Sequence, residues 1–152
     1  MDGGGRPLCF LLARLEALFV SEFEARLAAA GYKDLSLAHS ANVLRFLQHE
    51  GLRPGQLVQM ACVTKQAVSQ QVAYLQRCGY VTVGPDVHDS RARHVQLTAR
   101  GRDAQQVASQ LFAEIEQDWA HSLGTGRYGD LRTSLETALP HLTERAANHQ
   151  RA

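Results

Sequence analysis

The sequence predicts a mostly α-helical protein that carries one small β-hairpin. Apolar residues recur at helical spacing over long stretches near both ends of the chain, which is typical of amphipathic helices. Two alternating runs, YVTV and HVQLT, flank the turn-rich segment GPDVHDSRAR, and this pattern indicates a hairpin with a long exposed tip. With 152 residues, we expect a single chain domain over 1–152.

Capping residues and glycines place the first two helices. An apolar stripe predicts a long helix from Leu8 to about Ala30, which Gly31 stops. Ser36 can cap a second helix, which is expected to end near Gly51.

A third and a fourth helix follow in close succession. Pro54 suits the first turn of a short helix over 54–61, and Thr64 suits the cap of a helix that Gly79 closes. A turn of only one or two residues joins them. Three helices followed by a hairpin form a winged helix-turn-helix, which we assign to 35–101.

Long amphipathic helices flank this region. One is expected from Thr98 until GTG at 124–126 breaks it, and Pro140 is expected to kink or end the last helix. The helices over 8–30 and 103–146 offer more apolar surface than one small winged domain can cover. We therefore interpret them as N- and C-terminal dimerisation helices.

Composition argues against several classes of protein. The apolar stretch LCFLLARLEALFV is too short and too charged to span a membrane, so a cytoplasmic protein is expected. Three cysteines without a CxxC pair argue against a disulfide framework or a thiolate zinc site. The sequence has no GxSxG, HExxH or phosphate-loop motif, and we expect neither an enzyme nor a cofactor.

Positive charge is concentrated in the middle of the chain. Between Cys62 and Arg102, six basic residues outnumber two acidic ones, which gives this segment a net charge of +4. The whole chain carries only +1, so the remainder sums to −3. A basic middle between acidic flanks indicates a localised site for a polyanion.

The outward face of the fourth helix suits a DNA major groove. With Val68, Val72 and Leu75 turned inward, the outward side carries glutamine, serine and alanine, which can contact base edges without repelling phosphate. A polar surface helix without a ligand is the alternative. The DNA-binding residues predicted here and on the hairpin are Thr64, Lys65, Gln66, Ser69, Gln70, Arg77, Arg91 and Arg93.

The hairpin tip favours the DNA interpretation. Arg91 and Arg93 could enter an adjacent minor groove, whose negative potential attracts guanidinium groups. Asp89 could accept a bidentate bond from an arginine and so brace it. A surface salt bridge without a ligand is again the alternative.

These residues resemble the MarR family of bacterial transcriptional regulators. The family's wing signature stands here as Asp89, Arg91, Val95, Leu97, Thr98 and Gly101, and VSQQVAYLQRCGYV is similar to its recognition helix. The resemblance spans about Leu8 to Leu142. It implies a homodimer that binds a pseudo-palindromic duplex operator, and a repressor released by a small ligand or by oxidation. A winged-helix protein-interaction module without specific DNA binding is the alternative function.

Two departures from the family pattern matter for DNA binding. Thr82, Val83 and Gly84 stand where relatives carry an arginine soon after GYV, so one phosphate contact of the wing stem is in doubt. Gln70 stands where relatives often carry arginine, so an operator sequence cannot be carried over.

Cysteines, histidines and a candidate pocket bear on the control of binding. Cys9, in an LCF context at a helix start, resembles a peroxide sensor of the family, but the second helix lacks the tyrosines that would accompany it. We favour a packing role for it, and core positions for Cys62 and Cys78. His88 and His94 are expected to meet phosphate or water rather than a metal. On family architecture alone, Tyr32, His39 and Arg45 are candidates for an effector pocket.

Overall fold

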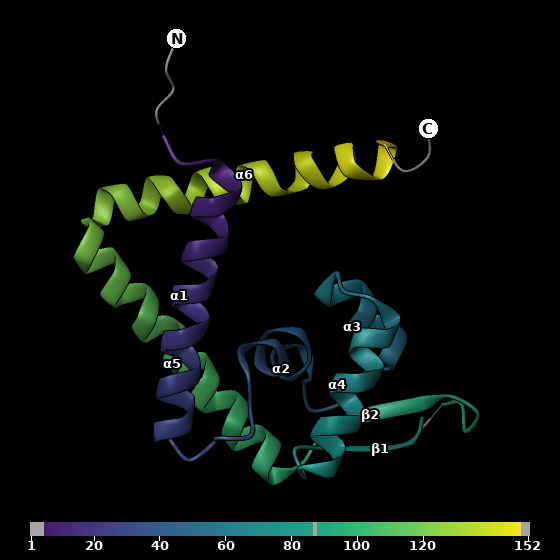
Figure 1. Ribbon diagram of the computed structural model, residues 1–152. Helices are drawn as coiled ribbons and strands as arrows, with labels where there is room; N and C mark the ends of the chain where they lie inside the picture. The colour runs from purple at the N-terminus through teal and green to yellow at the C-terminus, as the bar shows by residue number, and fades with distance from the viewer. Residues whose placement is uncertain (1–4, 87, 150–152) are drawn as a thin grey trace. The chain divides into compact units, whose positions relative to one another are not determined.

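The computed structural model describes residues 5–86 and 88–149, which form α-helices and one β-hairpin (Figure 1). The chain divides into two compact units, one that ends at Phe112 and one that begins at Ala113. The elements of the first unit are α1 (Leu8–Ala29), α2 (Leu37–Asn42), the 3₁₀ helix η1 (Leu44–Phe46), α3 (Pro54–Ala61), α4 (Lys65–Arg77), β1 (Val81–Pro85) and β2 (Arg93–Leu97). Helix α5 (Ala99–Leu123) continues into the second unit, which also holds α6 (Thr125–His149).

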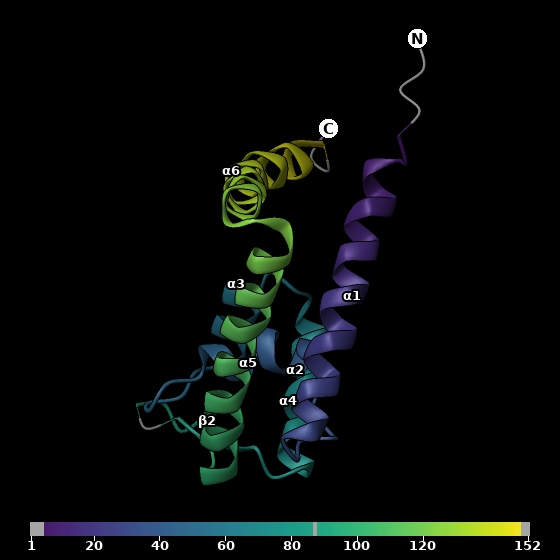
Figure 2. The ribbon, with the colours of Figure 1, turned by 90° about the vertical axis from the view of Figure 1, so that its left-hand side faces the viewer.

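Helix α1 packs against the first part of α5; the two helices lie next to one another in Figure 2 and cross in the view of Figure 1. The rings of Phe23 and Phe112 stack with their centroids 4.5 Å apart, and Phe23 and Leu27 are fully buried. Gly31 follows α1 with a positive φ of 101°, as expected for a glycine that ends a helix.

The second helix begins at its predicted cap but is shorter than predicted. The Ser36 hydroxyl accepts a hydrogen bond from the His39 amide at 3.3 Å. Helix α2 ends at Asn42 and a 3₁₀ turn follows it, whereas the sequence predicted a helix to about Gly51. The Gln105 side chain of α5 donates to the carbonyls of Leu44 (2.5 Å) and Leu47 (2.8 Å). These bonds satisfy the carbonyls after the α-helical hydrogen bonding has ended.

The third and fourth helices match their predicted positions. Pro54 is the first residue of α3, and Thr64 caps α4 by accepting a hydrogen bond from the Ala67 amide at 3.1 Å. Cys62 turns the chain between the two helices in the left-handed conformation, with φ of 54°. The two helices therefore form the expected helix-turn-helix.

The hairpin over 81–97, hereafter the wing, is antiparallel as predicted. Val83 pairs with Val95 in its register, and its tip projects away from the helices (Figure 1). Leu52 adds a single antiparallel bridge to Val95, with backbone hydrogen bonds of 2.9 and 2.8 Å. Gly51, at φ 69°, lies so close to the Val95 carbonyl that a Cβ atom there would overlap it.

The junction of the wing and α5 depends on Thr98 and Gly101. The Thr98 hydroxyl donates to the Gly79 carbonyl at 2.7 Å and accepts from the Gly101 amide at 3.0 Å. Gly101 is buried against the backbone carbonyl of Tyr80, and a Cβ atom at this position would overlap that oxygen. These contacts give a structural reason for the Leu-Thr-x-x-Gly part of the signature.

The second unit consists of the end of α5 and the whole of α6. Gly124 alone, at φ 84°, breaks the helix, whereas the sequence predicted a break over 124–126. Helix α6 continues through Pro140 to His149, so this proline does not end it. Arg132 of α6 links the two helices through an ion pair with Glu116 of α5 (2.6 Å), and it also pairs with Glu136 of its own helix (2.9 Å).

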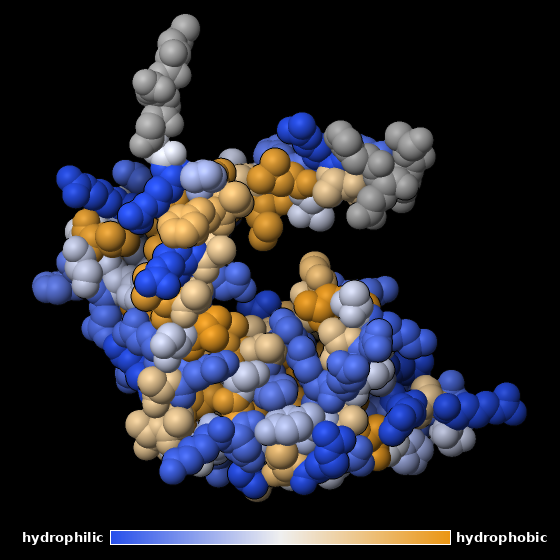
Figure 3. Space-filling view, viewed as in Figure 1, coloured by the Kyte–Doolittle hydropathy of each residue, from blue (hydrophilic) through white to orange (hydrophobic). Residues whose placement is uncertain are grey.

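Each unit carries an exposed apolar helix face. In the first unit it lies on α1, where apolar side chains are visible along the helix (Figure 3). In the second unit it lies on α6. The large exposed residues of the two faces are Leu8, Phe10, Leu11, Leu12, Leu15 and Leu18 on α1, and Leu135, Leu139 and Leu142 on α6. Within the described residues, no helix is both long and apolar enough to cross a membrane.

Candidate nucleic-acid interface

Helix α4 presents a polar face to solvent, as its periodicity predicted. Val68, Val72 and Leu75 are buried, which fixes the rotation of the helix. The side that faces away from them is exposed, and it carries Lys65, Gln66, Ser69, Gln70, Ala73 and Arg77. Arg77 also lies over the ring of Tyr74, 5.8 Å from its centroid. The Thr64 hydroxyl is occupied by capping the helix, so its first role is structural.

The surface around α4 lacks acidic side chains over a long stretch. Between Glu50 and Asp86 the sequence has no aspartate or glutamate, and the stretch includes all of α3, α4 and β1. A helix exposed only to water would usually carry both signs of charge. A surface with basic and amide groups but no carboxylates suits contact with phosphate and base edges.

The wing brings a second basic group to this surface. Arg93 opens β2 and lines a small cavity of about 80 Å³ together with Ser69 and Ala73 of α4 and Pro54 of α3. The two predicted components, recognition helix and wing, therefore adjoin one another. Arg91 and Arg93 each reach solvent, and the wing tip is strongly hydrophilic (Figure 3).

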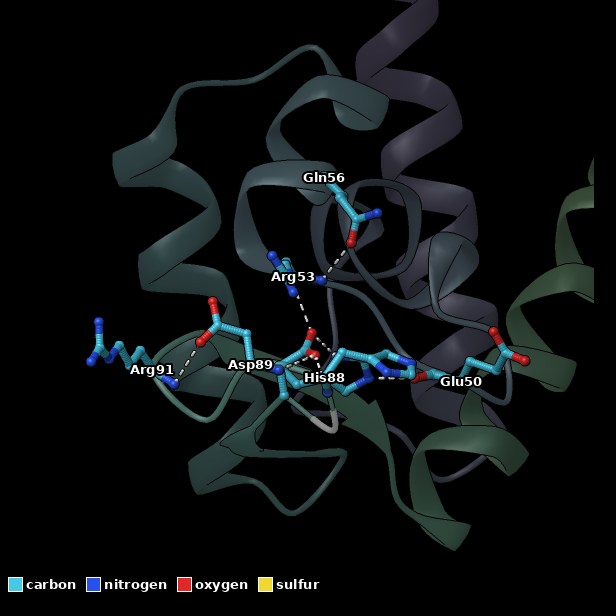
Figure 4. Close-up of polar contacts among 8 residues, drawn as sticks. Glu50, Arg53, Gln56, His88, Asp89 and Arg91 are labelled. Carbon is cyan, nitrogen blue, oxygen red and sulfur yellow. Dashed lines mark hydrogen bonds and ion pairs between the residues drawn. The ribbon is translucent and has the colours of Figure 1, made fainter.

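Asp89 holds the wing tip in a different way from the one predicted. Its carboxylate accepts a hydrogen bond from the backbone amide of Arg91 at 3.1 Å, and the Arg91 side chain extends away from it (Figure 4). The contact is that of a short polar residue that caps a turn. Asp89 therefore braces the backbone rather than a guanidinium group.

The main anchor of the wing is Asp86, which no local pattern in the sequence singles out. Its buried carboxylate accepts hydrogen bonds from Nε of Arg53 (2.8 Å) and from the backbone amides of His88 (2.8 Å) and Asp89 (3.3 Å). The hydrogen bond from Arg53, followed by that from His88, holds the pKa of Asp86 well below its usual range. An ionised carboxylate thus ties the wing tip to the start of α3.

His94 also belongs to this anchor. The sequence predicted that it would meet phosphate or water, but its ring is engaged within the fold. Its ring is largely buried; Nε2 contacts the carbonyl of Glu50, and Nδ1 lies 3.4 Å from Asp86. The contact between Nδ1 and the Asp86 carboxylate lacks hydrogen-bond geometry. His88 is exposed.

A second polar cluster supports α4 from beneath. The hydroxyl of buried Tyr80 donates to Asp34 at 2.5 Å, and Tyr74 donates to the Asp34 carbonyl at 2.7 Å. Burial, and then the hydrogen bond to Asp34, raises the pKa of Tyr80, so the phenol remains a donor. Arg100 pairs with Asp34 at 3.1 Å and stacks on the Tyr80 ring. Arg100, one of the six basic residues between Cys62 and Arg102, therefore has a structural role.

The cysteines differ in part from the predicted core positions. Cys62 is exposed at the turn between α3 and α4, and Cys78 is half-buried. Cys9 is exposed on α1. Within residues 5–86 and 88–149, no three histidine, cysteine or acidic side chains are grouped so that they could hold a metal ion.

The three candidates for an effector pocket are engaged in separate contacts. The His39 ring stacks on Tyr74 at 4.6 Å, the Tyr32 ring lies 6.3 Å from that of Tyr80, and Arg45 lies over the ring of Phe46. A different cavity, of about 320 Å³, opens elsewhere in the first unit. It is lined by Leu47, Gln48, His49, Leu97, Arg102, Gln105 and Gln106.

The fold and this surface together define a winged helix-turn-helix protein. A family model described as MarR family matches residues 33–92, which include α2, α3, α4 and β1. This match agrees with the resemblance that the wing signature carries. No curated protein matches the chain significantly.

Solved structures extend the likeness over most of the chain. A MarR family protein of Mycobacterium tuberculosis is 28% identical, with a TM-score of 0.62 over 87% of this chain and 93% of that one. Staphylococcus aureus MepR, in a structure with DNA, is 18% identical, with a TM-score of 0.77 over 90% and 99%. Streptococcus pneumoniae FabT, also solved with DNA, is 18% identical, with a TM-score of 0.75 over 90% and 96%. At such low identities, the last two show the shared fold alone.

Proposed function

We propose that this protein is a homodimeric transcriptional regulator that binds specific DNA sequences. The observation that carries the proposal is the exposed, carboxylate-free face of α4 beside a wing that presents two arginines. The solved complexes of MepR and FabT with DNA support it, because those proteins share this fold. The protein acts by binding rather than by catalysis, in the cytoplasm, where its DNA lies.

The residues divide by the kind of DNA contact that their chemistry permits. Gln66 and Gln70 are placed to read base edges in the major groove, and Ser69 can reach either a base or a phosphate. Lys65 and Arg77 contact the phosphate backbone at the two ends of α4. Arg91 and Arg93 enter the adjacent minor groove.

The dimer is proposed from the apolar faces of α1 and α6. Monomers rarely leave contiguous rows of exposed leucines, and a second copy is the simplest partner that can cover them. Two-fold symmetry would place two α4 helices about one DNA turn apart. The operator is therefore an inverted repeat.

We propose repression that is relieved by a small ligand or by oxidation. The cavity beside Arg102 and Gln105 has a size that suits a small ligand, and a cationic and amide lining that favours an anionic one. Cys9 is exposed, so an oxidant could reach it in the monomer. In the proposed dimer, the helix that carries Cys9 lies in the interface.

Selection from a pool of random duplexes, sequenced after binding at two salt concentrations, tests the function. The expected result is an inverted repeat with half-sites about one helical turn apart and binding that weakens steeply with salt. Gln70→Ala should relax the preference at defined positions, whereas Gln110→Ala, an exposed glutamine on α5, should not. Weak binding without sequence preference would instead favour a protein-interaction module.

A further inference from the structure

Arg53 is a basic residue outside the predicted DNA-binding set, and its two ends differ in environment. Nε donates to Oδ2 of Asp86 at 2.8 Å. The Asp86 side chain is only 7% exposed, whereas that of Arg53 is 45% exposed. The carboxylate is therefore a fixed internal anchor, and the outer part of the guanidinium group reaches solvent.

The backbone of Arg53 is also held in place. Its amide donates to Oε1 of Gln56 at 2.9 Å, and the preceding residue, Leu52, is bridged to the wing. The Asp86 carboxylate in turn accepts hydrogen bonds from two backbone amides of the wing tip. Little conformational freedom remains for this side chain to lose when it binds a ligand.

The chemistry of the exposed end selects an oxyanion. With Nε committed to Asp86, the two terminal nitrogens of Arg53 remain to donate in parallel, a geometry that matches two oxygens of a phosphate. The neighbouring residue, Pro54, lines the same small cavity as Ser69 and Arg93. Arg53 therefore borders the surface between α4 and the wing, at the start of the carboxylate-free stretch.

We propose that Arg53 binds a phosphate of the DNA backbone and that Asp86 is the positioning residue that aims it. The inference rests on the proposed function, because it names a further contact of the same interface. Asp86 thereby couples two parts of the protein–DNA contact: it orders the wing tip and orients an arginine at the start of α3.

The salt dependence of DNA binding distinguishes this role from a structural one. Arg53→Gln should weaken binding roughly tenfold, as expected for one charge-assisted hydrogen bond. The decrease should be similar for the operator and for an unrelated duplex, since a phosphate contact does not depend on sequence. The slope of log affinity against log salt should become shallower by about 0.9, the value expected when one phosphate is no longer neutralised.

Two comparison variants keep the test specific. Arg127→Gln removes an exposed arginine of α6 and should leave the slope unchanged. Arg53→Lys keeps the charge without the planar fork, and it should restore the slope but only part of the affinity. Circular dichroism and thermal melting of each variant report whether the wing region is still folded.

A different pattern would overturn the proposal. If Arg53→Gln lowers affinity for the operator alone and keeps the full salt slope, Arg53 acts only through the arrangement of the wing. If wild-type protein selects no sequence in the first place, the proposed regulator function fails, and this phosphate contact fails with it. The wild-type selection thus separates the two failures.

Discussion

At the tip of the wing, the backbone of Arg91 is fixed by Asp89 while its guanidinium group extends into solvent. We expect Arg91→Ala to lower operator affinity by about 1–3 kcal/mol and to leave the fold intact. Fluorescence anisotropy with a labelled operator measures the change. Arg127→Ala removes the same charge from α6 and should have little effect; equal effects in both variants would mean that net charge, not the wing, matters.

Only glycine fits at position 101, because the backbone of Tyr80 approaches it closely. A methyl group there would overlap the carbonyl oxygen of Tyr80, so Gly101→Ala must displace the junction of wing and helix. We expect a decrease of about 1–3 kcal/mol in the free energy of unfolding, measured with urea. Gly129→Ala, in open space on α6, should instead stabilise by about 0.5–1 kcal/mol. A Gly101→Ala protein as stable as wild type would contradict the close approach.

At the scale of the wing, the ionised Asp86 carboxylate predicts a particular pH dependence. Its folded-state pKa is lowered from the usual 3.8, so its contribution to stability is complete above that value and declines as the pH falls below it. The difference in Tm between wild type and Asp86→Asn should therefore be constant above about pH 5 and shrink below about pH 4.

The control for this experiment is Asp103→Asn, which changes an exposed carboxylate on α5. Its Tm should follow that of wild type throughout the titration. A difference between wild type and Asp86→Asn that grows as the solution is acidified would have the wrong sign for a carboxylate whose folded-state pKa is lowered.

Sequence patterns located most elements because their signals are local. Pro54 and Thr64 mark helix starts that depend on adjacent residues, and the α3 and α4 boundaries followed from them. The early end of α2 could not be predicted from local patterns. The carbonyls that follow this helix accept hydrogen bonds from Gln105, which is distant in the sequence. Periodicity within one helix does not contain such a partner.

In the candidate site too, local features could be predicted from the sequence and long-range contacts could not. The exposed face of α4 follows from helical periodicity, and the structure agrees with it. The ion pair of Arg53 and Asp86 joins residues 33 positions apart and left no local spacing to detect. A signal was available nonetheless: a stretch without acidic residues ends at Asp86, and such a carboxylate at the edge of a basic surface calls for a partner.

For the whole molecule, the exposed leucines of α6 predict its state of assembly. Leu139→Asp would place a charge in the proposed dimer interface, and we expect it to raise the dimer dissociation constant by at least about tenfold. Sedimentation velocity across a concentration series measures this constant. Operator binding should fall together with dimerisation, because one α4 helix reads only half of an inverted repeat.

Thr137→Asp provides the matched control, since it adds the same charge at an exposed polar position of α6. It should dimerise as wild type does. If Leu139→Asp also remained fully dimeric at low micromolar concentration, the apolar face of α6 would need another explanation than a second copy.

The hairpin itself has a consequence for solubility. An exposed β-strand offers unpaired amides and carbonyls to which a strand from another molecule can add. On one side of the wing, Leu52 already occupies the backbone groups of Val95; on the other, β1 is short and ends in Pro85, which has no amide hydrogen to donate. The wing can therefore project far into solvent, as the proposed DNA contact requires, without serving as a template for aggregation.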